Sequence, residues 1–422
     1  MADYGPFPFD NQQDLIDKSI RSCHPDQTRS WQQVGADLGI GKREDWCLYE
    51  LNGRRRLDLH LNGGTFNLGH RQPELVATLN DALDYFDLGN YWFPSVWQTA
   101  WSEALIKVNP GMTYLIFGAG GAEAVDIANK SACYATKCGK IVSILKGYHS
   151  DDGLSVPTGD LWFAKVFWSD QPDTFIQVAF NDFAAMEQVL ATGDIAALIM
   201  ETILATYGFP TTSDGYLGQG KALSEKYGAL YFADEVQIGM MRYGQLWGWQ
   251  TSVIQPDILI TAMDLSGGLN LIFGCLVNGH AGEWLNEDRL ADISTASRAE
   301  LGCEMAHKVI EILHRPETIA SVGTFTACFQ AAMADMMLRN CDIFTGVPQL
   351  GFSPRLEFDH AQETVQVSSV LYDHGVWAIF AALDKRVLQS IPGVLLRPEM
   401  CADIMKRFDA AMPRARELMA AA

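Results

Sequence analysis

The sequence predicts an α/β fold in which a mostly parallel sheet is covered by helices on both faces. Between residues 110 and 280, short apolar runs alternate with helical stretches. This alternation is typical of strand–helix units, whose parallel strands are buried on both faces and read as continuous apolar runs. The length of 422 residues, with 48% hydrophobic residues, allows one large domain with smaller appendages.

The first elements are an N-terminal helix and a hairpin. Residues 12–22 have the pattern of a helix, and residues 46–59 alternate about the pair Asn52-Gly53. An Asn-Gly pair between alternating runs is a strong local signal for a β-hairpin. Residues 67–74 then lead into an amphipathic helix that is expected to reach about Tyr85.

The alternating region contains six predicted strands and three predicted helices. The strands are Thr113–Phe117, Lys140–Leu145, Ala196–Met200, Ala229–Ala233, Ile258–Thr261 and Ile272–Val277. The helices are Ala122–Thr136, Phe183–Leu190 and Gly218–Tyr227. A long helix from Arg298 to His314 follows, and strands at 355–359 and 376–381 suggest a small α+β domain. The expected boundaries are 1–65 for the N-terminal arm and hairpin, 66–310 for the large domain and 311–422 for the C-terminal small domain.

Charge and composition exclude several classes of function. The net charge of −20, with acidic residues scattered along the chain, argues against nucleic-acid binding, which needs basic faces. No apolar run approaches the length of a membrane span, and the N-terminus lacks the features of a signal peptide. Nine cysteines without a CxxC pair predict reduced thiols in a cytoplasmic protein, and no metal site is expected.

Four motifs follow predicted strands or lie between elements. Gly118-Ala-Gly-Gly-Ala-Glu-Ala124 joins a strand to a helix, where small residues let backbone N–H groups face a phosphate. Gly147-Tyr-His-Ser150 follows the next strand. Leu230-Tyr-Phe-Ala-Asp-Glu-Val-Gln-Ile-Gly239 ends a buried strand at the carboxylate of Asp234. Pro256-Asp-Ile-Leu-Ile-Thr-Ala-Met-Asp-Leu-Ser-Gly-Gly268 combines a short apolar strand with a Gly-rich turn.

Together these motifs resemble those of the class III aminotransferases, in family order and over roughly residues 45 to 415. The resemblance implies a fold-type-I, pyridoxal-phosphate-dependent transferase, with a mostly parallel seven-stranded sheet in a large domain and a small α+β domain built from both termini. It also implies a two-fold dimer and substrates that are a small amine or amino acid and a keto acid.

The resemblance assigns roles to several residues. The backbone at Gly121 and Ala122 would hold the cofactor phosphate, and Thr295 would donate its hydroxyl to the phosphate of the neighbouring subunit. Tyr148 would stack on one face of the pyridine ring and Val236 on the other. The remaining cofactor contacts implied are Asp234 at the ring nitrogen, Gln237 at the ring hydroxyl and His149 as a hydrogen-bonding neighbour.

The family's lysine, which forms the Schiff base with the cofactor and then moves the substrate proton, falls on Met263. A thioether can do neither. Methionine is unbranched and nearly as long as lysine, so it fills the same space without disturbing the packing. The cofactor, as pyridoxal or pyridoxamine 5'-phosphate, would therefore be held non-covalently.

Other positions depart from the family pattern. Gly120 replaces a serine of the phosphate turn, and Ala296-Ser297-Arg298 replaces a Phe-Gly-Gly stretch. Gln389 replaces the arginine that clamps a substrate carboxylate in many members, and Glu201-Thr202 replaces Glu-Pro. Glu201, Gln389 and Arg298 are thus candidate substrate-side residues.

Three hypotheses follow from Met263. The first is an enzyme of amino-group transfer or related carbon–nitrogen chemistry that works without the lysine, with Tyr148, His149 or a residue of the second subunit as proton carrier. The second is a non-catalytic subunit, which pairs with an active paralogue in a heterodimer or binds the cofactor alone. The third is an ordinary transaminase whose lysine was replaced deliberately, although the other departures favour natural divergence.

Overall fold

The computed structural model describes residues 8–210, 212–252, 254–261, 263–287, 292–351 and 353–421. The chain divides into two compact units, which are described separately below. One unit consists of Met1–Gly63, Leu68–Gln72 and Thr324–Ala422, and the other of Gly64–Asn67 and Pro73–Gly323. Among the described residues, no helix is both long and apolar enough to cross a membrane.

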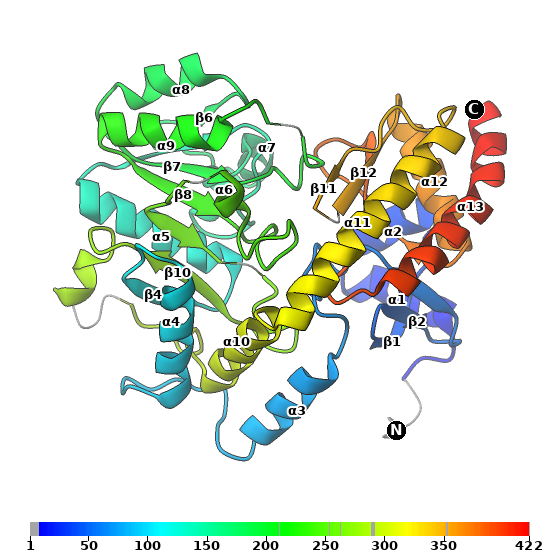
Figure 1. The fold of residues 1–422 in the computed structure, drawn as a ribbon, viewed down its shortest axis with the longest axis horizontal. Helices are drawn as coiled ribbons and strands as arrows, with labels where there is room; N and C mark the ends of the chain where they lie inside the picture. The colour runs from blue at the N-terminus through cyan, green and yellow to red at the C-terminus, as the bar shows by residue number, and fades with distance from the viewer. Residues whose placement is uncertain are drawn as a thin grey trace. The chain divides into compact units, whose positions relative to one another are not determined.

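The larger unit is built on a seven-stranded sheet with the strand order β4-β10-β9-β8-β7-β5-β6 (Figure 1). All neighbours pair in parallel except β10, which runs antiparallel to both β4 and β9. The strands are β4 (Tyr114–Gly118), β5 (Lys140–Ile144), β6 (Phe175–Val178), β7 (Ile195–Glu201), β8 (Leu230–Asp234), β9 (Ile258–Ile260) and β10 (Phe273–Val277). The predicted α/β class with a mostly parallel sheet is therefore confirmed, and β6 is the strand that the sequence pattern missed.

Strands β7 and β8 lie at the centre of the sheet because their residues are largely apolar. Every residue of β7 and of β8 is buried, as expected for strands covered on both faces. Helix α5 (Gly121–Thr136) packs along β4, β7, β9 and β10, and it brings small buried residues such as Ala124, Ala128 and Ala132 to the sheet. Helix α9 (Tyr216–Tyr227) packs on β7 and β8.

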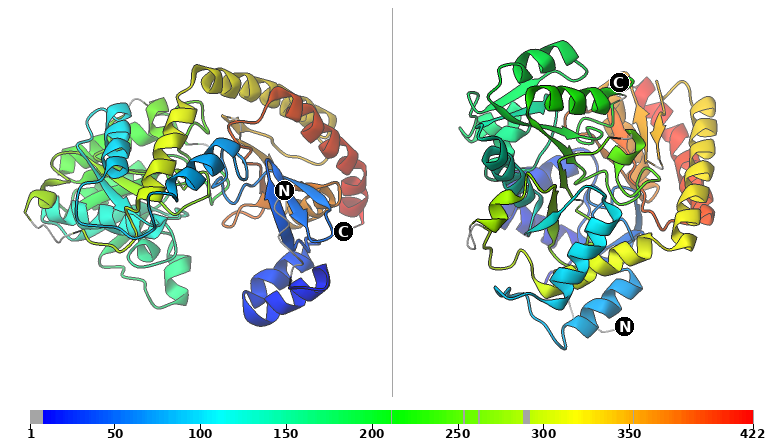
Figure 2. Two further views of the ribbon diagram at one scale, coloured as in Figure 1. Left: turned by 90° about the horizontal axis from the view of Figure 1, so that it is seen from below. Right: turned by 60° about the vertical axis from the view of Figure 1, so that its left-hand side comes forward.

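Further helices surround this sheet (Figures 1 and 2). They are α3 (Pro73–Ala82), α4 (Val96–Val108), α6 (Ser155–Thr158), α7 (Leu161–Val166), α8 (Phe183–Leu190) and α10 (Glu300–Leu313), with short 3-10 turns η1 (Gly248–Ser252) and η2 (Glu283–Asn286). Helix α3 ends at Ala82, before the predicted end near Tyr85. The loop between α3 and α4 carries exposed aromatic side chains at Tyr91, Trp92 and Phe93.

The other unit contains two four-stranded sheets, with the orders β1-β2-β3-β13 and β11-β12-β15-β14. Their strands are β1 (Ile40–Glu44), β2 (Cys47–Glu50), β3 (Arg55–Asp58), β11 (Gln349–Leu350), β12 (Ser353–Glu357), β13 (Val376–Trp377), β14 (Ile379–Phe380) and β15 (Val387–Gln389). The helices are α1 (Gln12–Ser22), α2 (Pro25–Gln33), α12 (Ala361–Asp373) and α13 (Pro398–Ala420), while α11 (Pro316–Arg339) runs across the division.

Two sequence expectations are resolved in this unit. The hairpin about Asn52-Gly53 is present as the antiparallel pair β2–β3, and Gly53 has a positive φ of 83°. The single strand expected at 376–381 is two short strands in different sheets. Residues 376–377 pair in parallel with β3, whereas residues 379–380 pair antiparallel with β15, so the chain passes from one sheet to the other.

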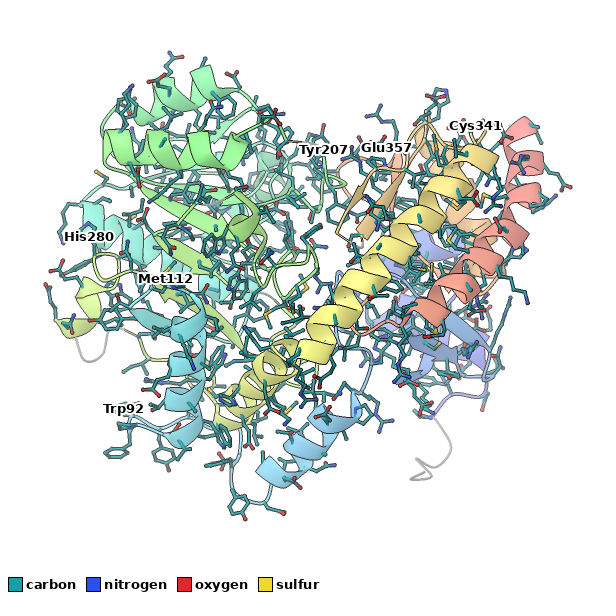
Figure 3. All side chains as sticks on the ribbon, viewed as in Figure 1. Trp92, Met112, Tyr207, His280, Cys341 and Glu357 are labelled. Carbon is teal, nitrogen blue, oxygen red and sulfur yellow. The ribbon has the colours of Figure 1, made fainter. Side chains whose placement is uncertain are left out.

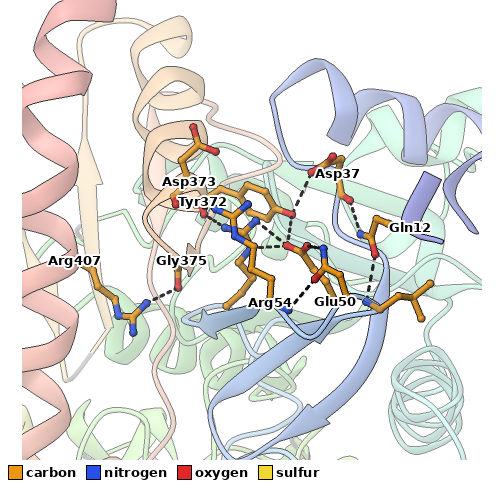
Figure 4. Close-up of polar contacts among 11 residues, drawn as sticks. Gln12, Asp37, Glu50, Arg54, Tyr372, Asp373, Gly375 and Arg407 are labelled. Atoms are coloured by element: carbon orange, nitrogen blue, oxygen red, sulfur yellow. Dashed lines mark hydrogen bonds and ion pairs between the residues drawn. The ribbon is translucent and has the colours of Figure 1, made fainter.

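A buried polar network joins the hairpin to α12 (Figure 4). The Arg56 guanidinium lies 2.7 Å from Glu50 and 3.8 Å from the centre of the Tyr372 ring. The Tyr372 hydroxyl lies 3.4 Å from Glu50 and 3.5 Å from Asp37. The network thus holds together segments that lie more than 300 residues apart in the sequence. The buried charge of Arg56 requires a partner of opposite charge, and Glu50 supplies it.

Candidate active site at the ends of strands β7 and β8

Two carboxylates end adjacent parallel strands of the larger unit. Glu201 ends β7 and Asp234 ends β8, and their Cα atoms are partners in the strand register. Both side chains are buried. Asp234 Oδ2 lies 2.6 Å from His149 Nδ1, and Glu201 Oε1 accepts a 2.9 Å hydrogen bond from the Tyr148 backbone N–H. The loop after β5 is therefore tied to both strand ends.

The charges in this cluster shift one another's ionisation. Burial alone would lower the pKa of His149, but its hydrogen bond to Asp234 and the negative charges of Asp234 and Glu201 raise the pKa overall. Burial raises the pKa of Glu201 to about 7, opposed by the positive charge of His149. This arrangement therefore favours the protonated form of His149.

Val236 contacts the same carboxylate, and Met263 is linked to Val236 through a backbone hydrogen bond. Asp234 Oδ1 accepts a 3.0 Å hydrogen bond from Val236 N–H, and Val236 carbonyl oxygen accepts a 2.9 Å bond from Met263 N–H. The Met263 side chain is half-buried, and its Sδ lies 3.1 Å from the Thr65 hydroxyl. The backbone bond between Met263 and Val236 holds residue 263 beside residue 236. Residue 236 follows Asp234 by two positions in the sequence.

Tyr148 presents a half-buried aromatic ring next to these groups. Its hydroxyl donates to Asp151 at 2.9 Å, and Phe163 from α7 meets the ring edge-on at 5.4 Å. Burial, followed by the charge of Asp151, raises the pKa of Tyr148, so the residue remains a neutral phenol at ordinary pH.

The turn between β4 and α5 borders the same region. Gly120 precedes the helix and has no side chain to cap it, while Glu123 accepts a 2.7 Å hydrogen bond from Ala119 N–H. A Cβ atom built on Gly121 would lie 3.8 Å from Val236 Cγ1 and 3.9 Å from Ser150 Oγ. The turn at Gly121 therefore lies next to both Val236 and the loop that follows β5.

An open cavity of about 580 Å³ lies along the first turns of α5. Gly120 and Ala122 line it, together with the carboxylates of Glu123, Asp126, Asp152 and Asp292 and the ammonium group of Lys130. The carboxylates give this cavity an acidic border. Among the described residues, no cluster of His, Cys, Asp or Glu has the arrangement of a metal site.

Four candidate residues from the sequence remain: Gln237, Thr295, Arg298 and Gln389. Gln237 is partly exposed directly after Val236. Thr295 is exposed, and its carbonyl oxygen accepts a 3.2 Å bond from Asn90 N–H; Ile293, two residues earlier, lines the acidic cavity. The Arg298 carbonyl oxygen accepts a 2.9 Å bond from Gln98 in α4. Gln389 is buried in β15 of the other unit.

Sequence reasoning missed three polar groups near this site, of which the first two are buried and the third is partly buried. Glu235 accepts 2.8 Å bonds from Gly248 and Trp249 N–H, and it also contacts the Thr202 hydroxyl. Burial raises its pKa to about 7. The feature of the sequence that could have indicated Glu235 is its position directly after Asp234.

The second missed group is the ion pair of Arg242 Nη2 with Asp264 Oδ2 at 3.1 Å, in which both side chains are buried. Burial raises the pKa of Asp264 to about 7. The third is Thr65, which contacts Met263 from more than 190 residues away, and no local pattern could have identified it.

The part of the site around Asp234 fits the pyridine ring of pyridoxal phosphate. A carboxylate offers about four lone-pair directions, so Asp234 can accept a further proton donor besides His149 and Val236 N–H. Gly120 leaves open space, since no heavy atom lies within 4 Å of a Cβ built there. Asp234, Tyr148, His149, Val236 and the Gly121–Ala122 backbone are the residues that would hold the cofactor.

Comparisons with known proteins bear on the fold and the family of the chain. The family described as "Aminotransferase class-III" matches residues 32–412. The chain is 32% identical over 410 residues to an uncharacterized aminotransferase of Archaeoglobus fulgidus, covering 94% of each chain. It is 26% identical to a putrescine aminotransferase of Pectobacterium atrosepticum, covering 87% of this chain and 82% of that protein. The fold is similar to that of the ornithine aminotransferase of Toxoplasma gondii, with a TM-score of 0.87, 19% identity and 97% of both chains covered.

Proposed function

We propose a function for this chain from the premise that it belongs to the class III aminotransferase family. Members of this family depend on pyridoxal 5'-phosphate, which is therefore the cofactor of this fold. We infer that the chain binds this cofactor, or its pyridoxamine form, without a covalent bond. Its chemistry is amino-group transfer or related carbon–nitrogen chemistry on a small amine or amino acid, with a keto acid as second substrate.

The observation that carries the proposal is the buried pair of Asp234 and His149, beside which Met263 N–H is bound to Val236. His149 holds the Asp234 side chain in place through a charge-assisted hydrogen bond. Asp234 is then suited to hold a proton at the ring nitrogen. When bound, the cofactor supplies an electron sink for the charge that develops on the substrate.

Proton transfer at the substrate carbon needs a group other than Met263. His149 is fully buried and engaged with Asp234, whereas Tyr148 is half-buried and its hydroxyl is bound to Asp151. Tyr148 is the more accessible of the two, but as a neutral phenol with a raised pKa it can donate a proton and not accept one. A residue of the second subunit of a dimer is the alternative. Nine free thiols and the likeness to aminotransferases support a cytoplasmic location for such an enzyme.

The position of residue 263 provides the main test. The wild-type protein should bind pyridoxal phosphate reversibly, lose it on gel filtration and show no lysine adduct after borohydride treatment and peptide mapping. Met263→Lys should retain the cofactor, become labelled at residue 263 and gain transaminase activity. Met263→Gln, which has similar length but no amine, is the control and should behave as wild type. Absence of binding, or stoichiometric labelling of another lysine in the wild type, would overturn the proposal.

A second candidate function is that of a non-catalytic subunit paired with an active paralogue. The exposed aromatic residues Tyr91, Trp92 and Phe93 favour it, because together they offer apolar surface for a second chain; Trp92 is labelled in Figure 3. The backbone of Asn90 binds Thr295, so this surface adjoins the residue expected to serve a neighbouring site. Cofactor binding by Met263→Lys without activity, and co-purification with a lysine-bearing homologue, would favour this candidate over a homodimeric enzyme.

A further inference from the structure

Ser150 combines a strained backbone with a polar side chain. Its φ of 92° lies in the left-handed region, where a side chain is unfavourable and glycine is preferred. A serine in such a conformation weakens the fold relative to glycine, so its side chain is a candidate for a functional role.

The Ser150 hydroxyl faces the turn that begins α5. It lies 3.9 Å from the position of a Cβ on Gly121, and Val236 Cγ1 lies 3.8 Å from the same position. No hydrogen bond joins the Ser150 side chain to any residue in the described part of the chain. The hydroxyl is therefore available to a ligand that occupies this neighbourhood.

The turn between β4 and α5 lacks a hydroxyl group that the resemblance to the class III aminotransferases predicts there. Gly120 stands where the family has serine, and no side chain caps the first turn of α5. The first N–H groups of a helix need acceptors and attract anions, but the carboxylates of Glu123 and Asp126 border this turn. An added neutral donor would offset part of the repulsion that these carboxylates exert on a phosphate.

We propose that the Ser150 hydroxyl donates a hydrogen bond to the cofactor phosphate and thereby replaces the hydroxyl that is absent at Gly120. This inference rests on the proposed binding of pyridoxal phosphate. The loop after β5 would thus supply a serine hydroxyl that the turn before α5 lacks, at the expense of backbone strain at residue 150.

The test compares pyridoxal phosphate with pyridoxal, which lacks the phosphate, by tryptophan fluorescence titration of the cofactor-free protein. Ser150→Ala should weaken pyridoxal phosphate binding about tenfold, since a hydrogen bond to a charged group is lost, and should leave pyridoxal binding unchanged. Ser150→Gly should weaken binding equally while raising the thermal midpoint of the cofactor-free protein, because the strain is relieved. Gly120→Ser combined with Ser150→Gly should recover most of the affinity.

The outcomes separate this inference from the proposed function. If the wild type binds neither compound, the proposed function fails and this inference fails with it. If the wild type binds pyridoxal phosphate but Ser150→Ala binds it equally well, only the role of Ser150 is refuted. Equal losses for pyridoxal and pyridoxal phosphate would also refute it, since the hydroxyl would then not act on the phosphate.

Discussion

Replacement of His149 by phenylalanine would leave Asp234 as a buried carboxylate without its charged partner. The phenyl ring is flat like the imidazole but somewhat larger, so the substitution removes the 2.6 Å hydrogen bond and the positive charge and adds a packing cost that does not depend on pH. Removal of one partner from a buried ion pair costs about 3–5 kcal/mol. Asp234 keeps its bond from Val236 N–H, so we expect a loss near the lower end, about 3 kcal/mol of unfolding free energy.

The loss should depend on pH in a defined direction. The folded state raises the pKa of His149 above that of the unfolded chain, through Asp234 and Glu201 and against the effect of burial. The stabilisation from the charged pair is then complete below about pH 6.5, the usual histidine pKa, and disappears as the pH rises through the raised folded value. The cost of His149→Phe should therefore be larger at pH 6 than at pH 9.

Urea unfolding of the cofactor-free protein at both pH values measures this difference. His280→Phe is the matched control, because His280 is exposed on the surface of the same unit (Figure 3), and we expect a change within about 0.5 kcal/mol. The reasoning would be refuted by a His149→Phe loss below about 1 kcal/mol at pH 6, or by a loss that grows with pH.

The remaining predictions concern stability. Arg242→Met should cost about 3–5 kcal/mol because it leaves Asp264 buried and unpaired, and a second change, Asp264→Leu, should restore at least half of that loss in urea unfolding. If the double variant were less stable than the single one, the pair would not be coupled as described. Gly53→Ala should cost about 1 kcal/mol, since φ is 83° and no atom lies within 4 Å of the added Cβ. Gly139→Ala, where the space is equally open and φ is not positive, should cost nothing; equal losses at the two glycines would contradict the explanation by backbone strain.

The sequence alone predicted the class of fold and most of the large sheet. The apolar runs that became β7 and β8 are buried throughout, so strand and burial can be recognised from a few consecutive residues. The Asn52-Gly53 turn was recognisable for the same reason, because its backbone requirement is local. Likewise, a carboxylate at the end of a buried strand marked Asp234 before any contact was known.

Tertiary structure decided which of these segments meet. Only long-range pairing places β10 antiparallel between β4 and β9, and divides residues 376–380 between two sheets. The contact of Thr65 with Met263 and the pairing of Arg242 with Asp264 likewise join distant or unpatterned positions. Periodicity records how a segment is buried, but the partner of a buried polar group depends on segments that the local sequence does not specify, which is why these contacts appear only in the folded chain.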